Sequence, residues 1–160
     1  MDPIAVRTLS VPVENGQFHL GGDGDPDALE RAFDEAVASG RFVGTAGGVV
    51  AVATPAEDSA GTPITVELWA AEMVDDTWDH EVDIDLDVPG DGLAVRTTAG
   101  DDDVVPEVPA GPYRARISGR GFAPLGEGDG DDEEYRIRLW PRSARQAPQV
   151  RRSWPGWADY

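Results

Sequence analysis

The segment DHEVDIDLDVPG, residues 79–90, alternates an acidic residue with an aliphatic one for four rounds. Such strict alternation predicts a β-strand with one buried face, because successive side chains of a strand point to opposite faces of the sheet. Carboxylates on one face would lie roughly 6.6 to 6.8 Å apart, which is twice the rise per residue. Something must therefore offset their repulsion. The aliphatic face comprises Val82, Ile84, Leu86 and Val88, and the acidic face comprises Glu81, Asp83, Asp85 and Asp87.

Most of the remaining chain also has period-two patterns. Turn clusters rich in Gly, Pro and Asp separate the candidate strands, which is typical of an antiparallel β-sandwich or open barrel. We predict a mostly β protein, an antiparallel β-sandwich with one helix. Residues 82–98 are interpreted as a hairpin whose turn contains Gly90, Asp91 and Gly92. The candidate strands span residues 11–20, 47–54, 63–72, 80–88, 92–98, 112–119 and 134–141.

One amphipathic helix is predicted at about residues 26–39. Pro26 suits the first helical position, Asp27 followed by Glu30 resembles a capping box, and Gly40 suits the C-terminal stop. The spacing of the apolar residues favours one buried face. We expect three side chains of the helix to pack on the sheet: Leu29, Phe33 and Val37.

Length and composition predict a single intracellular domain. The 160 residues suffice for one domain with its own core. We assign residues 1–142 to the sandwich and residues 143–160 to an irregular tail containing Arg and Trp. The absence of cysteine excludes disulfides and thiolate sites and suits a reducing cytoplasm. Neither a secretory leader nor a membrane-length apolar run is present, so we expect a soluble cytoplasmic protein without a membrane partner.

The charge is large and unevenly distributed along the chain. The formal net charge is -18, and all 13 basic residues are arginine. Residues 1–110 hold 24 acidic residues and 4 arginines, whereas residues 111–160 hold 7 acidic residues and 9 arginines. An acidic surface repels nucleic acid and steers basic proteins toward itself. The charge therefore predicts a basic protein partner and no nucleic-acid partner, with solubility as the alternative explanation.

The acidic strand has two interpretations. Arg114, Arg116, Arg136 and Arg138 alternate along the last two predicted strands. Opposite charges directly across an antiparallel pair contribute about 0.2 to 1 kcal/mol each, so the carboxylates could simply face these arginines. Alternatively, the acidic face is open and binds a cationic partner.

For the second interpretation we name a set of partner-binding candidates. The tail tryptophans enter it because Trp is enriched in binding hot spots, although both could instead pack back on the sandwich. The candidates are Glu81, Asp83, Asp85, Asp87, Asp101, Asp102, Asp103, Trp154 and Trp157.

The sequence offers little for catalysis or metal binding. His19 and His80 are the only histidines, and neither belongs to a nucleophile, phosphate-loop or zinc-binding motif. Residues 23–34 begin like a calcium loop, but Ala28 occupies the position that requires glycine. The acidic segment 126–134 is interpreted as a solvated hairpin tip, with loose binding of a divalent cation as the alternative. We expect no enzyme activity, no cofactor and no metal.

The order of elements resembles a known family. The strand ending in QFHL, the helix, the strand TAGGVVAVAT, the strand ITVELW and the turn PAGPY leading into a strand follow one another over residues 10–120. In this respect the chain resembles the competence protein J family of nuclease inhibitors and its β-sandwich relatives. The resemblance implies a small acidic protein that binds and blocks a nuclease, without catalytic residues. The chain departs from the family in its acidic loop at 126–134 and in its tail from about residue 143.

From these features we predict a non-catalytic acidic binding protein that inhibits a nuclease or another basic protein. The alternative is a structural or ligand-binding β-sandwich module whose acidity serves solubility.

Overall fold

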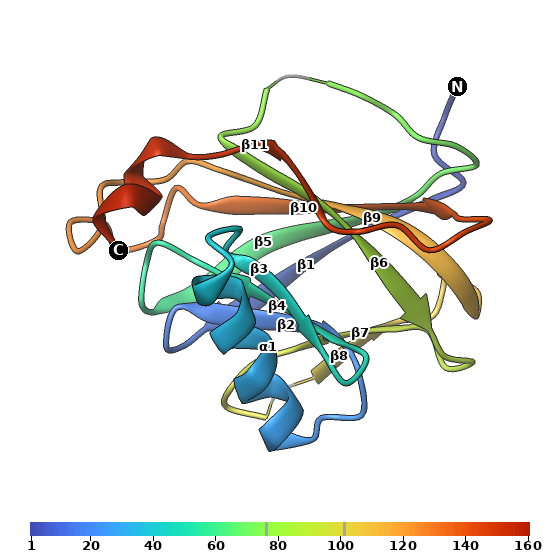
Figure 1. The fold of residues 1–160 in the computed structure, drawn as a ribbon, viewed down its shortest axis with the longest axis horizontal. Coiled ribbons are helices and arrows are strands. Elements are labelled where there is room, and N and C mark those ends of the chain that lie inside the picture. The colour runs from blue at the N-terminus through green and yellow to red at the C-terminus, as the bar shows by residue number, and fades with distance from the viewer. Residues whose placement is uncertain (76, 101) are drawn as a thin grey trace.

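The computed structural model describes residues 1–75, 77–100 and 102–160. Within these residues the strands form two sheets that face one another (Figure 1). The six-stranded sheet comprises, in spatial order, β1 (Ala5–Val13), β5 (Ser59–Leu68), β10 (Glu134–Pro141), β9 (Gly111–Arg120), β6 (His80–Val88) and β11 (Gln149–Arg152). The five-stranded sheet comprises β3 (Val43–Ala46), β4 (Val49–Ala53), β2 (Gln17–Gly21), β7 (Leu93–Arg96) and β8 (Asp102–Val105). The predicted β-sandwich with one helix is confirmed.

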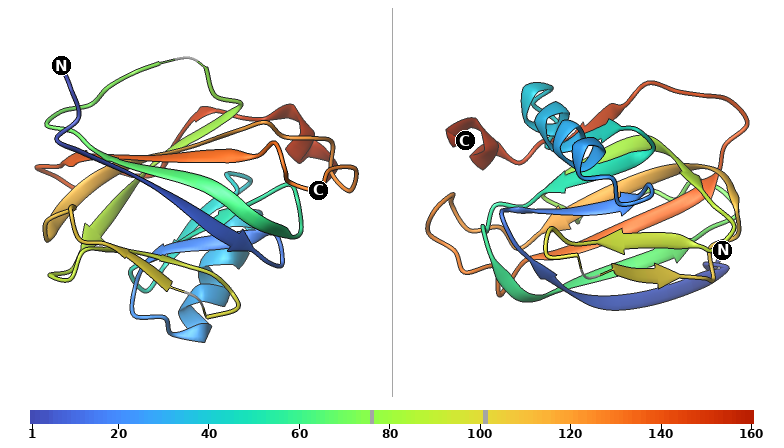
Figure 2. Two further views of the ribbon diagram at one scale, coloured as in Figure 1. Left: turned by 180° about the vertical axis from the view of Figure 1, so that it is seen from behind. Right: turned by 90° about the horizontal axis from the view of Figure 1, so that it is seen from below.

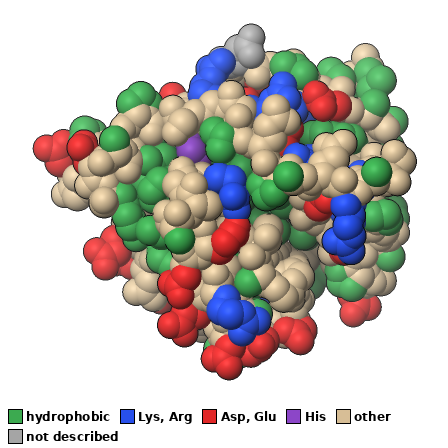
Figure 3. Space-filling view, viewed as in Figure 1, with side chains coloured by type: hydrophobic (Ala, Val, Ile, Leu, Met, Phe, Trp, Pro, Cys, Tyr) green, Lys and Arg blue, Asp and Glu red, His purple; other side chains and the backbone are tan. Residues whose placement is uncertain are grey.

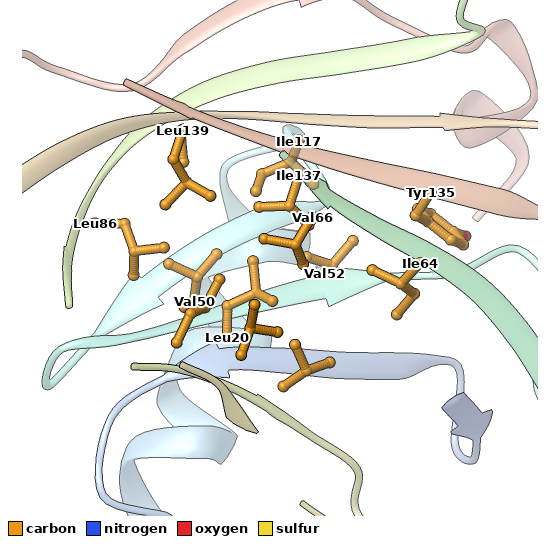
Figure 4. Close-up of a cluster of buried hydrophobic side chains, with 14 of the residues drawn as sticks. Leu20, Val50, Val52, Ile64, Val66, Leu86, Ile117, Tyr135, Ile137 and Leu139 are labelled. Atoms are coloured by element: carbon orange, nitrogen blue, oxygen red, sulfur yellow. The ribbon is translucent and has the colours of Figure 1, made fainter. Parts of the chain in front are cut away.

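The core lies between the two sheets (Figure 4). Leu20, Val50 and Val52 of the five-stranded sheet face Ile64, Val66 and Ile137 of the six-stranded sheet. The inward face of β6 is the one that the alternation predicts, and all four of its aliphatic side chains are buried. Burial of a Val, Leu or Ile side chain contributes about 1.5 to 3 kcal/mol, so this face fixes which side of β6 points inward.

Two details of the strand pairing differ from the prediction. β5 and β10 pair in parallel, so the six-stranded sheet is mixed and not purely antiparallel. Residues 82–98 are not a hairpin, because β6 and β7 belong to different sheets. β6 pairs instead with β9, which sets Arg114 and Arg116 opposite its carboxylates, whereas the described part of β7 contains one arginine, Arg96.

The helix α1 (Pro26–Ala38) lies across the outer face of the five-stranded sheet (Figure 2, right). Pro26 occupies the first helical position as predicted, and Gly40 adopts a left-handed φ of 72° just after the helix. The N-cap is Asp25, whose carboxylate accepts a hydrogen bond from the backbone N–H of Asp27 at 3.2 Å. The predicted capping box at Asp27 is therefore wrong by two positions.

The predicted buried face of the helix is confirmed only in part, because Leu29, Phe33 and Val37 pack on the sheet but are not its most buried side chains. Ala28, Ala32 and Ala36 are buried against the sheet, while the larger apolar side chains lie half-buried at the flanks. The reason is Gly44 in β3, where a Cβ atom would lie 2.2 Å from the carbonyl oxygen of Ala32. The helix backbone approaches β3 so closely that only small side chains fit between them.

The C-terminal tail packs on the sandwich and has regular structure in part. β11 pairs antiparallel with β6, and a 3₁₀-helix (Pro155–Asp159) follows it, whereas residues 142–148 are irregular as expected. The Trp157 ring is buried and stacks on Phe42, with ring centroids 4.0 Å apart. Of the two interpretations of the tail tryptophans, the structure shows the one in which they pack back. Among the described residues, no helix is both long and apolar enough to cross a membrane.

Candidate functional site

The carboxylates of β6 lie opposite arginines of β9. Asp83 is the cross-strand neighbour of Arg116, and Asp85 that of Arg114. The Asp83 carboxylate accepts hydrogen bonds from Arg116 Nε at 2.8 Å and from Arg116 Nη2 at 2.9 Å, a two-point contact between nearly fully buried groups. Asp85 Oδ1 accepts one from Arg114 Nη1 at 2.9 Å. These pairs offset the repulsion along the acidic strand.

The two ends of the acidic row are also occupied by contacts within the chain. Glu81 is buried and accepts a hydrogen bond from the Ser118 hydroxyl at 2.7 Å. Asp87 forms an ion pair with Arg142 at 2.7 Å, and its side chain remains 64% exposed. Partner binding by the β6 carboxylates stays a prediction, and it would require breaking buried contacts of Glu81 and Asp83 and a partly buried contact of Asp85.

The segment between β5 and β6 covers this charged face. It passes over the outer side of the six-stranded sheet (Figure 1). The Met73 carbonyl accepts hydrogen bonds from Arg116 at 2.7 Å and from Arg138 at 3.4 Å. Asp75 pairs with Arg136 at 2.6 Å, and this hydrogen bond lowers the pKa of the Asp75 carboxyl. Sequence reasoning missed this cover, because an acidic segment between two strands gives no sign of where it lies.

Arg96 joins two acidic segments that are far apart in the sequence. Its guanidinium donates hydrogen bonds to the carbonyls of Gly21 at 3.0 Å and Gly22 at 2.7 Å, and it pairs with Asp102 of β8 at 2.6 Å. The loop before α1 is thereby held beside β8. The exposed carboxylates that it gathers form what we call the α1/β8 acidic surface: Asp23, Asp25, Asp27, Asp102 and Asp103.

The α1/β8 acidic surface differs from the β6 row in being exposed. All five of its residues are exposed, and acidic side chains gather over the end of the molecule where α1 lies (Figure 3). Two of the predicted partner-binding residues, Asp102 and Asp103, belong to this surface, while Asp101 lies outside the described residues. In the sequence, the acidic loop before α1 resembles a calcium loop and marks the start of the helix, but it does not indicate that the loop lies beside β8.

The tail tryptophans and His80 form a separate contact. The backbone N–H of Trp154 donates to His80 Nδ1 at 3.0 Å, so His80 Nε2–H donates to the Arg41 carbonyl at 2.6 Å. Burial lowers the pKa of His80 and keeps the ring neutral. Trp154 is half-buried and Trp157 is buried, so these side chains hold the tail in place and are not jointly exposed. Their binding of a partner stays a prediction.

His19 is fully buried beside Arg96 in the five-stranded sheet. Within the described residues, neither of its ring nitrogens has a hydrogen-bond partner. Burial, with the charge of Arg96 adding to it, lowers the pKa of His19 to about 4. Both histidines are thus inaccessible and neutral near pH 7. In the described part of the chain, no group of three or more His, Asp and Glu side chains is placed to hold a metal ion.

Comparison with known proteins identifies the fold. No family model and no curated protein matches the chain. Among solved structures, it is similar to ComJ from Bacillus subtilis, an inhibitor of the DNA degrading activity of NucA. The TM-score is 0.58 at 15% identity, covering 88% of this chain and 98% of that one. It is also similar to the crocagin biosynthetic protein J, with a TM-score of 0.54 at 16% identity, covering 87% and 99%. The predicted resemblance in fold is confirmed.

Proposed function

We propose that this chain is a non-catalytic protein that binds and inhibits a nuclease or another basic protein through the α1/β8 acidic surface. The observation that carries the proposal is the contrast between its two acidic regions. The β6 carboxylates are paired with arginines, whereas those of the α1/β8 acidic surface are exposed, on a chain with a net charge of -18. The similarity in fold to a nuclease inhibitor supports the choice of partner.

A nuclease is a physically apt partner for such a surface. Proteins that hold a nucleic-acid backbone use Lys and Arg to neutralise its phosphates, and exposed carboxylates can occupy the same positive field. Charge complementarity of this kind mainly raises the association rate, and it weakens as salt is added. The nuclease need only be blocked, so the inhibitor requires no catalytic residue.

Three residues allow the surface to be tested without disturbing the fold. Asp27 and Asp103 belong to the surface, and Glu30 lies on α1 next to it; all three are exposed. Within the described residues, none of these side chains takes part in an ion pair or a hydrogen bond. Asp25 and Asp102 are poor choices, because Asp25 caps the helix and Asp102 pairs with Arg96.

The experiment compares two triple variants that change the net charge equally. The first is Asp27→Asn/Glu30→Gln/Asp103→Asn, and the matched control at the hairpin tip is Glu127→Gln/Asp131→Asn/Asp132→Asn. Basic proteins captured from the source cell by the wild-type chain are assayed for DNA degradation and for their association rate. We expect the first variant to associate about tenfold more slowly at low salt, with a smaller difference at high salt. Equal reductions of the association rate in both triple variants would show that the net charge of the protein, and not this surface, determines the rate.

A further inference from the structure

A cleft separate from the α1/β8 acidic surface opens at one side of the sandwich. It has a volume of about 450 Å³ and lies between the β3–β4 hairpin, the second half of β6 and the chain that follows β10. This volume falls within the roughly 300 to 1,000 Å³ of small-molecule sites. Ala46 and Pro148 provide an accessible apolar part of its wall, and polar side chains line much of the rest. None of the five residues of the acidic surface lines it.

The cleft exists because the outer edge of β6 is only partly covered. β11 pairs with residues 81–83 of β6, and no described strand pairs with residues 84–87 on that side. The chain between β10 and β11 bends away instead, held by the backbone N–H of Gln146, which donates to the Asp85 carboxylate at 2.9 Å. Opposite this gap, Gly47 and Gly48 form the hairpin turn with left-handed φ values of 56° and 80°.

One arginine that lines the cleft has no ion-pair partner among the described residues. Asp85 pairs with Arg114, and Asp87 pairs with Arg142. Arg145 also lines the cleft and is exposed. It takes part in no ion pair or hydrogen bond within the described part of the chain. This unpaired arginine lines the cleft together with the accessible apolar side chains of Ala46 and Pro148, in a protein of net charge -18.

We propose that the cleft binds a small organic anion, a carboxylate with an apolar body. The apolar body lies against Ala46 and Pro148, and the carboxylate accepts charge-assisted hydrogen bonds from Arg145. The overall negative charge does not prevent this, because at about 0.15 M ionic strength exposed charges are screened beyond roughly 8 Å. Recognition here uses none of the five residues of the proposed nuclease contact and does not depend on it.

The first measurement compares two probes on the full-length protein by titration calorimetry or fluorescence. The probes are 1-naphthaleneacetate and its neutral counterpart 1-naphthaleneacetamide, which share an apolar body and differ in charge. We expect the carboxylate to bind about tenfold more tightly than the amide, the ratio typical of one charge-assisted contact. Equal affinities, or no binding of the carboxylate, would overturn the proposal.

The second measurement locates the site with three variants. Arg145→Gln should weaken 1-naphthaleneacetate about tenfold and leave the amide unchanged. Thr45→Trp, at an exposed position that lines the cleft, should block both probes. The matched control is Arg7→Gln, which removes an exposed arginine on β1 and should leave both affinities unchanged. The assignment of Arg145 would be overturned if Arg145→Gln left the affinity for 1-naphthaleneacetate intact. It would also be overturned if Arg7→Gln lowered that affinity equally.

Thermal unfolding of each variant separates loss of binding from loss of fold. Arg145 and Thr45 are exposed, so all three variants should unfold near the wild-type temperature. Because Thr45→Trp fills the cleft without changing charge, loss of binding in a folded Thr45→Trp protein supports the site independently of Arg145. If the folded Thr45→Trp protein still bound both probes, the assignment of the site to this cleft would be overturned.

Discussion

The row of carboxylates on β6 and the α1/β8 acidic surface contain the same residue types in opposite circumstances. On β6, Asp83 and Asp85 lie directly across from arginines, and the segment that contains Met73 lies on the Asp83–Arg116 pair. On the α1/β8 acidic surface, Asp102 pairs with Arg96, and the other carboxylates are left exposed with no ion pair among the described residues. The difference teaches that a run of acidic residues is not by itself a binding surface. What decides its role is whether the neighbouring strand supplies the opposite charge.

The first way to break this comparison is to remove an arginine of β9 that pairs with the β6 carboxylates. Arg116→Met leaves Asp83 buried without its partner, and losing one member of a buried pair costs about 3 to 5 kcal/mol of the free energy of unfolding. The double variant Asp83→Leu/Arg116→Met should recover much of the loss, since apolar replacements of a buried pair are often nearly neutral. Urea unfolding measures both. A single variant as stable as the wild type would mean that the pair does not hold the sheet.

The second prediction concerns two buried histidines. His19 lies next to Arg96, which holds the α1/β8 acidic surface together, and His80 lies at the start of β6. The folded pKa of His19 is lowered from 6.5 to about 4, so its contribution to stability is complete above pH 6.5 and is lost as the pH falls toward 4. At 1.36 kcal/mol per pKa unit the loss is about 3 kcal/mol. Burial lowers the pKa of His80 as well, so the stability that neutral His80 contributes is also lost as the pH falls.

Urea unfolding on either side of this pH window measures the effect. The control is His19→Leu, which removes the titrating group together with two buried nitrogens that lack partners in the described chain. This variant should lose less stability on acidification than the wild type. If His19→Leu retains the full pH dependence, other groups cause it.

The smallest effect on stability is expected for changes in the α1/β8 acidic surface. The triple variant Asp27→Asn/Glu30→Gln/Asp103→Asn should change the free energy of unfolding by no more than about 0.5 kcal/mol, because these side chains are exposed. The change should be toward greater stability at low salt, where repulsion between like charges is strongest. Thermal unfolding at two salt concentrations tests this. A loss comparable with that of Arg116→Met would mean that both acidic regions are structural.

Much of the fold was determined by local sequence patterns. The alternation in β6 specified which side chains face the core, because side chains point to opposite faces at every second residue whatever the neighbouring strand is. Pro26 and Gly40 marked the ends of the helix for reasons that lie in their own backbone preferences. The acidic composition predicts a basic partner without reference to any contact, and that partner stays a prediction.

The tertiary structure decided what depends on residues far apart in the sequence. Pairing of β6 with β9, and not with β7, set Asp83 and Asp85 against arginines, and Gly44 selected alanines as the most buried side chains of α1. Arg96 joined the loop before α1 to β8, and the incomplete edge of β6 left the cleft beside Arg145. A periodic pattern tells which face of an element is buried. It does not tell which distant segment comes to lie against the other face, because that is settled by the packing of the whole chain.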